Sequence, residues 1–124
     1  MSVGYDVAQF MKASEAQWPE GEDKKLIEFR ISLLDQKYDE LVQALQWGDR
    51  EIIAKEAADF VYYVVGTCEV LDIPFDDVWV AVHESNMSKL DDEGKAIIGP
   101  DGKVQKGPNY KGPEKRIEQL VKRA

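Results

Sequence analysis

The chain has 124 residues and a formal net charge of −8, with 44% hydrophobic and 32% charged residues, a composition typical of one globular domain over residues 1–124. The acidic balance argues against binding to nucleic acid or to an anionic membrane, because both need a basic patch, but it does not exclude a small phosphate ligand. No stretch approaches the roughly 20 apolar residues of a membrane span, no signal peptide is recognisable, and the single Cys68 excludes an internal disulfide, so we expect a cytoplasmic protein.

Helices dominate the elements predicted for the first half of the chain. A first helix is expected over about residues 4–14, and the stretch around Pro19 and Gly21 predicts a loop. A long helix follows over about residues 24–46, and Gly48 marks its end.

The second half begins with another long helix, which Asp49 can cap and which runs to about residue 71. Pro74 opens a fourth helix that reaches about Ser88, because proline is tolerated in a first helical turn. A Gly/Pro-rich segment then predicts a small hairpin with its turn at residues 99–102, followed by a short terminal helix. We therefore predict an all-α fold, a helical bundle of four to five helices with a C-terminal loop or small hairpin.

The helix over residues 24–46 carries charges inside its apolar face. Its apolar arc predicts burial, and its opposite arc predicts solvent contact. Arg30 and Lys37 fall inside the apolar arc, and Glu40 lies at its edge. Either the long cationic side chains extend their heads to water, or this face meets a polar site within the bundle. The apolar arc comprises Leu26, Leu33, Leu34, Leu41, Ala44 and Leu45, and the opposite arc Glu28, Ser32, Asp35 and Asp39.

Two carboxylates, Glu56 and Asp59, open the apolar run KEAADFVYYVVG on the third helix. Their spacing places them on one face of a helix that is apolar nearly all round and therefore expected to be central. Buried carboxylates need cations. Arg30, Lys37 or Lys55 can supply them in a structural network, or the pair can be part of a Mg²⁺ site, since this ion prefers oxygen ligands.

The fourth helix ends with Asn86 and Lys89, one turn apart. An amide and an ammonium at this spacing can hold a phosphate or a sugar hydroxyl. The same residues are also typical of a helix C-terminus, where Asn ends the helix and Lys complements the dipole.

Taken in chain order, the segments FRISLLDQKYDEL, KEAADFVYYVVG, HESNMSKLDDEGK and VQKGPNY resemble the all-α nucleoside triphosphate pyrophosphohydrolases. This superfamily includes MazG-like proteins and phosphoribosyl-ATP pyrophosphohydrolase. The resemblance covers about residues 5–113 and is closest to short, single-domain, phage or bacterial MazG-like members. It implies a helical bundle that forms homodimers or homotetramers and cleaves a nucleoside triphosphate into the monophosphate and pyrophosphate.

The resemblance also implies site residues. Family members bind Mg²⁺ or Mn²⁺ through Glu-Glu-x-x-Glu on one helix and Glu-x-x-Asp on the next. Glu56 and Asp59 match the second motif, and Glu40 matches the last glutamate of the first, which implies catalytic and metal-binding roles for all three. Asn86 and Lys89 match the family's substrate-contacting Asn and Lys.

The chain departs from this pattern where Gln36 and Lys37 stand in place of the two leading glutamates. Gln36 can still offer a carbonyl oxygen to substrate, metal or water. Lys37 cannot bind Mg²⁺ while protonated, so we expect its ammonium to reach Glu56 and Asp59 and to replace one metal ion of a multi-metal site. Lys89, with Arg30 or Lys37, is expected to stabilise charge on the pyrophosphate leaving group.

Three functional hypotheses follow. The first is metal-dependent hydrolysis of a (deoxy)nucleoside triphosphate, which would control or clean the nucleotide pool. The second is a nucleotide-binding protein that has lost catalysis, which the altered first motif favours. The third is a structural bundle that holds an ion network, against which the SNMSK and KGPNY segments argue. Base specificity stays open, with four aromatic residues as candidates for stacking on a base: Trp18, Trp47, Trp79 and Tyr110.

Overall fold

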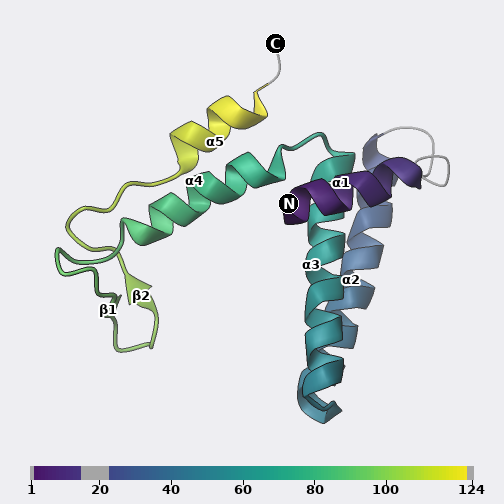
Figure 1. Ribbon diagram of the computed structural model, residues 1–124, viewed down its shortest axis with the longest axis horizontal. Helices are drawn as coiled ribbons and strands as arrows, with labels where there is room; N and C mark the ends of the chain where they lie inside the picture. Colours follow the sequence, from purple (N-terminus) through teal and green to yellow (C-terminus); the bar gives the residue numbers. More distant parts are fainter. Residues whose placement is uncertain (1, 15–22, 123–124) are drawn as a thin grey trace. The chain divides into compact units, whose positions relative to one another are not determined.

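The computed structural model describes residues 2–14 and 23–122 (Figure 1). Within these ranges the chain forms five helices and one two-stranded hairpin, which confirms the mostly helical prediction. Packing divides the chain into two compact units, Met1–Ile73 and Pro74–Ala124, and each is described by itself. The loop predicted around Pro19 and Gly21, and the stacking candidate Trp18, lie outside the described residues.

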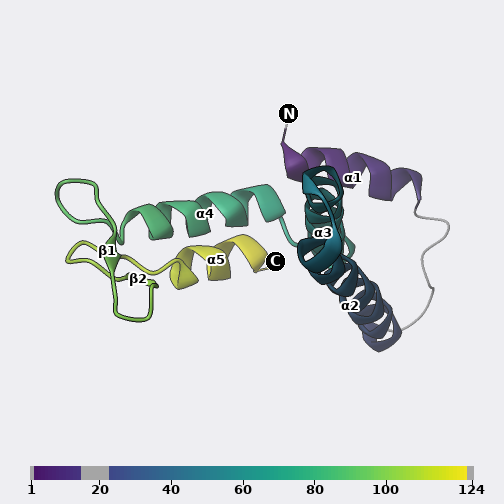
Figure 2. The same ribbon diagram turned by 90° about the horizontal axis from the view of Figure 1, so that it is seen from below.

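The first unit consists of three helices, α1 (Val3–Ala13), α2 (Asp23–Trp47) and α3 (Arg50–Val70). Helices α2 and α3 run side by side in opposite directions, and α1 lies across the pair near the end of α3 (Figures 1 and 2). Because α3 packs against both α1 and α2, its predicted central place is confirmed within this unit.

Local signals in the sequence set the ends of these helices. Gly48 follows α2 at a sharp bend, where an added Cβ would lie 2.8 Å from the Ala44 carbonyl oxygen. Asp49 then caps α3, because its side chain accepts a hydrogen bond of 3.1 Å from the Ile52 N–H. At the other end Asp72 takes a φ of +59°, and the Ile73 N–H donates to the Cys68 carbonyl, which closes the helix with a Schellman motif.

The apolar arc predicted for α2 is only partly buried. Ala44 is buried, but Leu45 is 60% exposed, so its predicted burial was wrong. The reason is geometric: α3 covers one side of α2, and Leu45 lies beyond that side. All four polar residues of the opposite arc are exposed, as predicted.

The second unit contains α4 (Phe75–Met87), β1 (Ile97–Ile98), β2 (Val104–Gln105) and α5 (Glu114–Val121). The strands pair antiparallel, and the Gly102 N–H donates to the Gly99 carbonyl, which confirms the predicted hairpin turn. Helix α5 packs against α4. Among the described residues, no helix is both long enough and apolar enough to cross a bilayer.

Candidate active site

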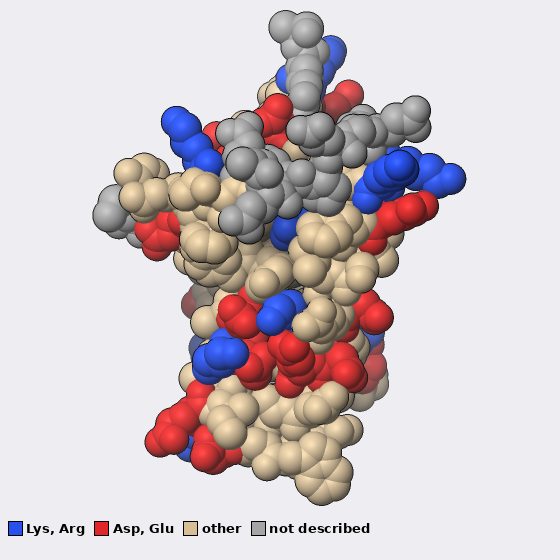
Figure 3. Space-filling model, turned by 90° about the vertical axis from the view of Figure 1, so that its right-hand side faces the viewer, with Lys and Arg blue, Asp and Glu red and all other residues tan. Residues whose placement is uncertain are grey.

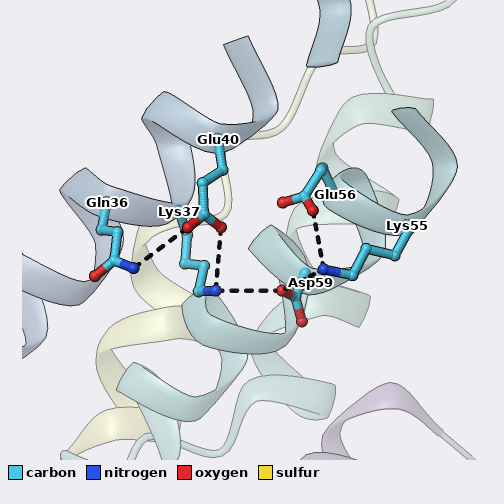
Figure 4. Close-up of polar contacts among 6 residues, drawn as sticks. All are labelled: Gln36, Lys37, Glu40, Lys55, Glu56 and Asp59. Atoms are coloured by element: carbon cyan, nitrogen blue, oxygen red, sulfur yellow. Dashed lines mark hydrogen bonds and ion pairs between the residues drawn. The ribbon is translucent and has the colours of Figure 1, made fainter. Parts of the chain in front are cut away.

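Six polar side chains from α2 and α3 point toward one another in the first unit (Figure 4). The spacings of three and four residues within each group place its members on one face of a helix. Since α2 and α3 lie side by side, the two faces meet. The α2 group is Gln36, Lys37 and Glu40, and the α3 group is Lys55, Glu56 and Asp59.

Three carboxylates converge at the centre of this group. Glu40, Glu56 and Asp59 each offer one oxygen, and the three oxygens lie within 4.8 Å of one another. Glu56 is the most buried, with 14% of its side chain exposed. Like charges at such a separation repel, so the arrangement requires cations nearby.

Lys37 supplies the first cation and joins the two helices. Its ammonium lies 3.1 Å from Glu40 Oε2 on its own helix and 3.4 Å from Asp59 Oδ2 on α3. The ammonium also lies 5.0 Å from the centroid of the Tyr63 ring, at cation–π distance. The predicted contact of Lys37 with Asp59 is present, but its second partner is Glu40 and not Glu56, which pairs with Lys55 instead.

These contacts shift the pKa of both α2 partners toward the charged form. The hydrogen bond to Glu40 is the main reason that the pKa of Lys37 is raised. The pKa of Glu40 is lowered, first by the hydrogen bond from Lys37 and then by that from Gln36, whose amide nitrogen lies 3.3 Å from Glu40 Oε1. Both groups are therefore ionised at neutral pH.

Lys55 supplies a second cation from the outer side of the cluster. Its ammonium lies 2.9 Å from Glu56 Oε1 and 3.8 Å from Asp59 Oδ2. The hydrogen bond to Glu56 is the main cause of the raised pKa of Lys55. Three carboxylates and two ammoniums leave one negative charge on the cluster. On the face of the molecule drawn in Figure 3, acidic side chains gather in a band with basic side chains among them.

One carboxylate oxygen in this cluster has no donor. Glu56 Oε2 is buried and has no hydrogen-bond partner within the described part of the chain. A buried, unsatisfied carboxylate oxygen is costly and calls for a cation or a bound water. Oxygen donors at this separation, with a residual negative charge, fit one divalent cation such as Mg²⁺ or Mn²⁺.

Arg30 lies outside this ion network. It is 7% exposed, and its guanidinium donates to Thr67 Oγ1 at 3.0 Å and to the Tyr63 carbonyl at 2.9 Å. Gly66 makes room for it, because a Cβ there would lie 3.0 Å from Arg30 Nη2. Burial lowers the pKa of this guanidinium.

Two hollows flank the carboxylates. A cavity of about 470 Å³ has Arg30 and Asp59 among its lining residues, with aromatic side chains from α1, α2 and α3. A recess of about 350 Å³ is lined by Glu40, Glu56 and Trp47, which is 85% exposed. The ring of Tyr63 lies at cation–π distance from both Arg30 and Lys37. Neither Tyr63 nor the exposed Phe10 had been singled out from the sequence, because the spacing of aromatic residues alone predicts only that they belong to the core.

Asn86 and Lys89 belong to the second unit. Asn86 is exposed in the last turn of α4, and the Lys89 carbonyl accepts a hydrogen bond of 3.0 Å from the Gly107 N–H. A Cβ on Gly107 would lie 2.4 Å from that carbonyl oxygen, so only glycine allows the approach. Nearby, Ser85 Oγ donates to the Lys111 carbonyl at 2.8 Å. The SNMSK and KGPNY segments thus hold each other in place, a structural role that the sequence had not indicated.

Comparison with known families decides the membership of the chain. A model of the phosphoribosyl-ATP pyrophosphohydrolase family matches residues 5–86, which is more than half of the chain. The chain belongs to this family. No curated protein matches the sequence.

The phosphoribosyl-ATP pyrophosphohydrolase family is part of the all-α superfamily that the motifs resemble, and its members are pyrophosphohydrolases. The matched residues include the whole α2–α3 cluster and end at Asn86, before Lys89. Glu40, Glu56 and Asp59, the three acidic residues that fit the superfamily pattern, are the ones that converge. Lys37, which departs from that pattern, lies between two of them.

Replacing Lys37 with methionine tests whether its ammonium is needed between these carboxylates. We expect Lys37→Met to lower the melting temperature in EDTA, because Glu40 and Asp59 would then face each other without a cation between them. Lys25→Met is the matched control, because Lys25 is an exposed lysine of the same helix that lies outside the cluster, and exposed charges contribute at most about 1 kcal/mol.

The measurement is thermal unfolding of both variants in EDTA and in excess Mn²⁺. The difference in melting temperature between the wild type and Lys37→Met should be smaller in excess Mn²⁺ than in EDTA, since a bound ion stabilises the folded state. A Lys37→Met protein as stable in EDTA as Lys25→Met would contradict the role given to this ammonium.

Proposed function

We propose that this chain hydrolyses a (deoxy)nucleoside triphosphate to the monophosphate and pyrophosphate, with Mg²⁺ or Mn²⁺ as cofactor. The observation that carries the proposal is the convergence of three carboxylate oxygens within 4.8 Å, in a chain of a pyrophosphohydrolase family. A triphosphate is preferred to phosphoribosyl-ATP because the motifs resemble the MazG-like branch more closely. Such an activity serves control or cleaning of the nucleotide pool.

In the proposed reaction, a water oxygen forms a bond to the α phosphorus. The bond from that phosphorus to the bridging oxygen breaks, and pyrophosphate leaves with the electron pair. Glu40, Glu56 and Asp59 would hold the cation, which when bound neutralises phosphate charge and acidifies a water molecule. Glu56 Oε2, which has no donor within the described residues, is the carboxylate oxygen best able to orient that water or accept its proton.

The remaining polar residues take positioning roles in this proposal. The Lys37 ammonium holds Glu40 and Asp59 together and contributes a fixed positive charge where the resemblance implies a metal-binding glutamate. Gln36 orients Glu40 through its amide. For Asn86 and Lys89, which lie in the second unit, the resemblance implies contacts to the sugar or the phosphates and, for Lys89, stabilisation of the leaving pyrophosphate.

A second candidate function is nucleotide binding without turnover. The observation in its favour is that Lys37 already pairs with two of the three carboxylates, which reduces their need for a metal ion. The two functions differ in one result, the release of pyrophosphate.

We also propose that the chain works as a homodimer or homotetramer. Among the described residues of the first unit, an apolar stripe on α2 stays largely exposed, and its residues recur at intervals that place them on one helical face. An apolar face of this kind is stabilised when a second copy covers it. The stripe consists of Ile27, Ile31, Tyr38 and Leu45, which are 43 to 60% exposed.

Hydrolysis is tested by incubating the protein with each common nucleoside triphosphate in Mg²⁺ or Mn²⁺ and measuring pyrophosphate. We expect Glu56→Ala to reduce release by about 100-fold or more, since even supporting groups around a metal contribute up to about that factor. Glu51→Ala, an exposed glutamate on the same helix, should behave as the wild type. The second candidate function is correct if the wild-type protein releases no more pyrophosphate than Glu56→Ala with any nucleotide, while calorimetry still detects nucleotide binding.

The oligomer is tested by introducing a charge into the α2 stripe. Ile31→Glu should lower the molar mass in light scattering toward that of one 14.1 kDa chain, because a carboxylate in an apolar interface is strongly unfavourable. Ser32→Glu adds the same charge on the exposed opposite face and should leave the mass unchanged. A wild-type protein that is monomeric at micromolar concentration would refute the proposal.

A further inference from the structure

The cavity beside Asp59 combines aromatic walls with a buried cation. Its volume of about 470 Å³ lies within the range of about 300–1,000 Å³ found for small-molecule sites. Phe10 and Tyr62 meet edge to face in its wall, with ring centroids 5.7 Å apart. The described lining is Phe10, Met11, Ser14, Phe29, Arg30, Leu33, Asp59, Tyr62 and Tyr63.

Arg30 gives this cavity its chemistry. The Arg30 residue is more than nine-tenths buried, and no carboxylate of the described residues lies within ion-pair distance of its guanidinium. Two of its five N–H groups are used by Thr67 and the Tyr63 carbonyl. These two bonds, with the Tyr63 ring 5.8 Å away, fix the plane of the guanidinium and leave three donors without an acceptor among the described residues.

A phosphate does not suit this cavity. Its other walls are mainly aromatic or aliphatic, with Asp59 at one side, and a carboxylate repels a phosphate. Arg30 is the only cationic side chain among the described lining residues. A flat, uncharged ring with hydrogen-bond acceptors on one edge fits better, because it can contact the aromatic rings and accept from Arg30.

We propose that this cavity binds the nucleobase, and that Arg30 selects bases with an oxo group at the edge it meets. Guanine offers two neighbouring acceptors, O6 and N7, to an arginine fork, and uracil and thymine offer O4. Adenine and cytosine carry an amino group at the corresponding position, which would set donor against donor.

The position of the cavity links it to the cluster of Glu40, Glu56 and Asp59. Asp59 belongs to both, so a base in the cavity places the sugar and α phosphate toward the carboxylates. This inference therefore rests on the proposed hydrolysis of a nucleoside triphosphate and specifies its substrate class as an oxo-base nucleotide.

Binding of deoxynucleoside monophosphates, measured by calorimetry in EDTA, tests the inference without metal or turnover. We expect dGMP or dUMP to bind at least about tenfold more tightly than dAMP and dCMP, within the discrimination of one good arginine contact. Phe10→Ala should weaken the binding of the preferred monophosphate about tenfold, as expected for loss of one base–aromatic contact. Phe10 is 56% exposed, so this variant should fold.

Three further variants complete the experiment. Tyr5→Ala removes an exposed aromatic side chain of the same helix that does not line the cavity, and it should bind as the wild type. Arg30→Lys keeps the charge but loses the fork, and it should lose the preference for oxo bases. Trp47→Ala removes the aromatic residue of the other hollow and should bind as the wild type.

The inference is overturned if no monophosphate binds, if amino bases bind equally well, or if Trp47→Ala weakens binding and Phe10→Ala does not. Its failure can be told from that of the proposed function. If Phe10→Ala and the wild type both release pyrophosphate with the same KM, the proposed base site is refuted but the proposed hydrolysis is supported. Monophosphate binding that depends on Phe10, without pyrophosphate release, would keep the base site and refute hydrolysis.

Discussion

The ion pairs of Lys37 connect the fold of the first unit to its chemistry. One ammonium, at 3.1 Å and 3.4 Å, joins a carboxylate of α2 to a carboxylate of α3. Each helix alone would carry acidic groups toward an apolar face, where they are unfavourable without a cation. With Lys37 between them, the helices can pack side by side and keep three carboxylates together.

The same interaction limits what the cluster can bind. Lys37 forms ion pairs with Glu40 and Asp59, and Lys55 forms ion pairs with Glu56 and Asp59. The buried oxygen Glu56 Oε2 has no hydrogen-bond donor among the described residues. One negative charge remains, which suits one divalent cation better than several. In a family of pyrophosphohydrolases, this arrangement supports the proposal that the Lys37 ammonium replaces one metal ion.

Much of the fold was predictable because its signals are local. Asp49 caps α3, glycine and proline mark the turns, and the hairpin forms at Gly99–Gly102, each through contacts between residues close in sequence. The exposure of Leu45 was not predictable, because it depends on how far α3 covers α2.

Helical spacing alone placed Glu56 and Asp59 on one face, and only the resemblance to the pyrophosphohydrolase motifs implied Glu40 as their neighbour. Glu40, Glu56 and Asp59 were expected together and lie together. The sequence left open whether the Arg30 head reaches water or lies inside the bundle, because its burial depends on Gly66 leaving room and on the Thr67 hydroxyl, contacts between residues more than 35 positions apart. The roles of Asn86 and Lys89 stay predictions.

We propose that the α2–α3 cluster binds one divalent ion because the Lys37 ammonium occupies the position of a second. Electron paramagnetic resonance of metal-titrated protein counts the bound Mn²⁺ and tests this directly. We expect one Mn²⁺ per chain in the wild type, none at this site in Glu56→Gln, and a second ion in Lys37→Glu. Two ions per wild-type chain, or none in protein that is folded, would show that Lys37 does not have this role.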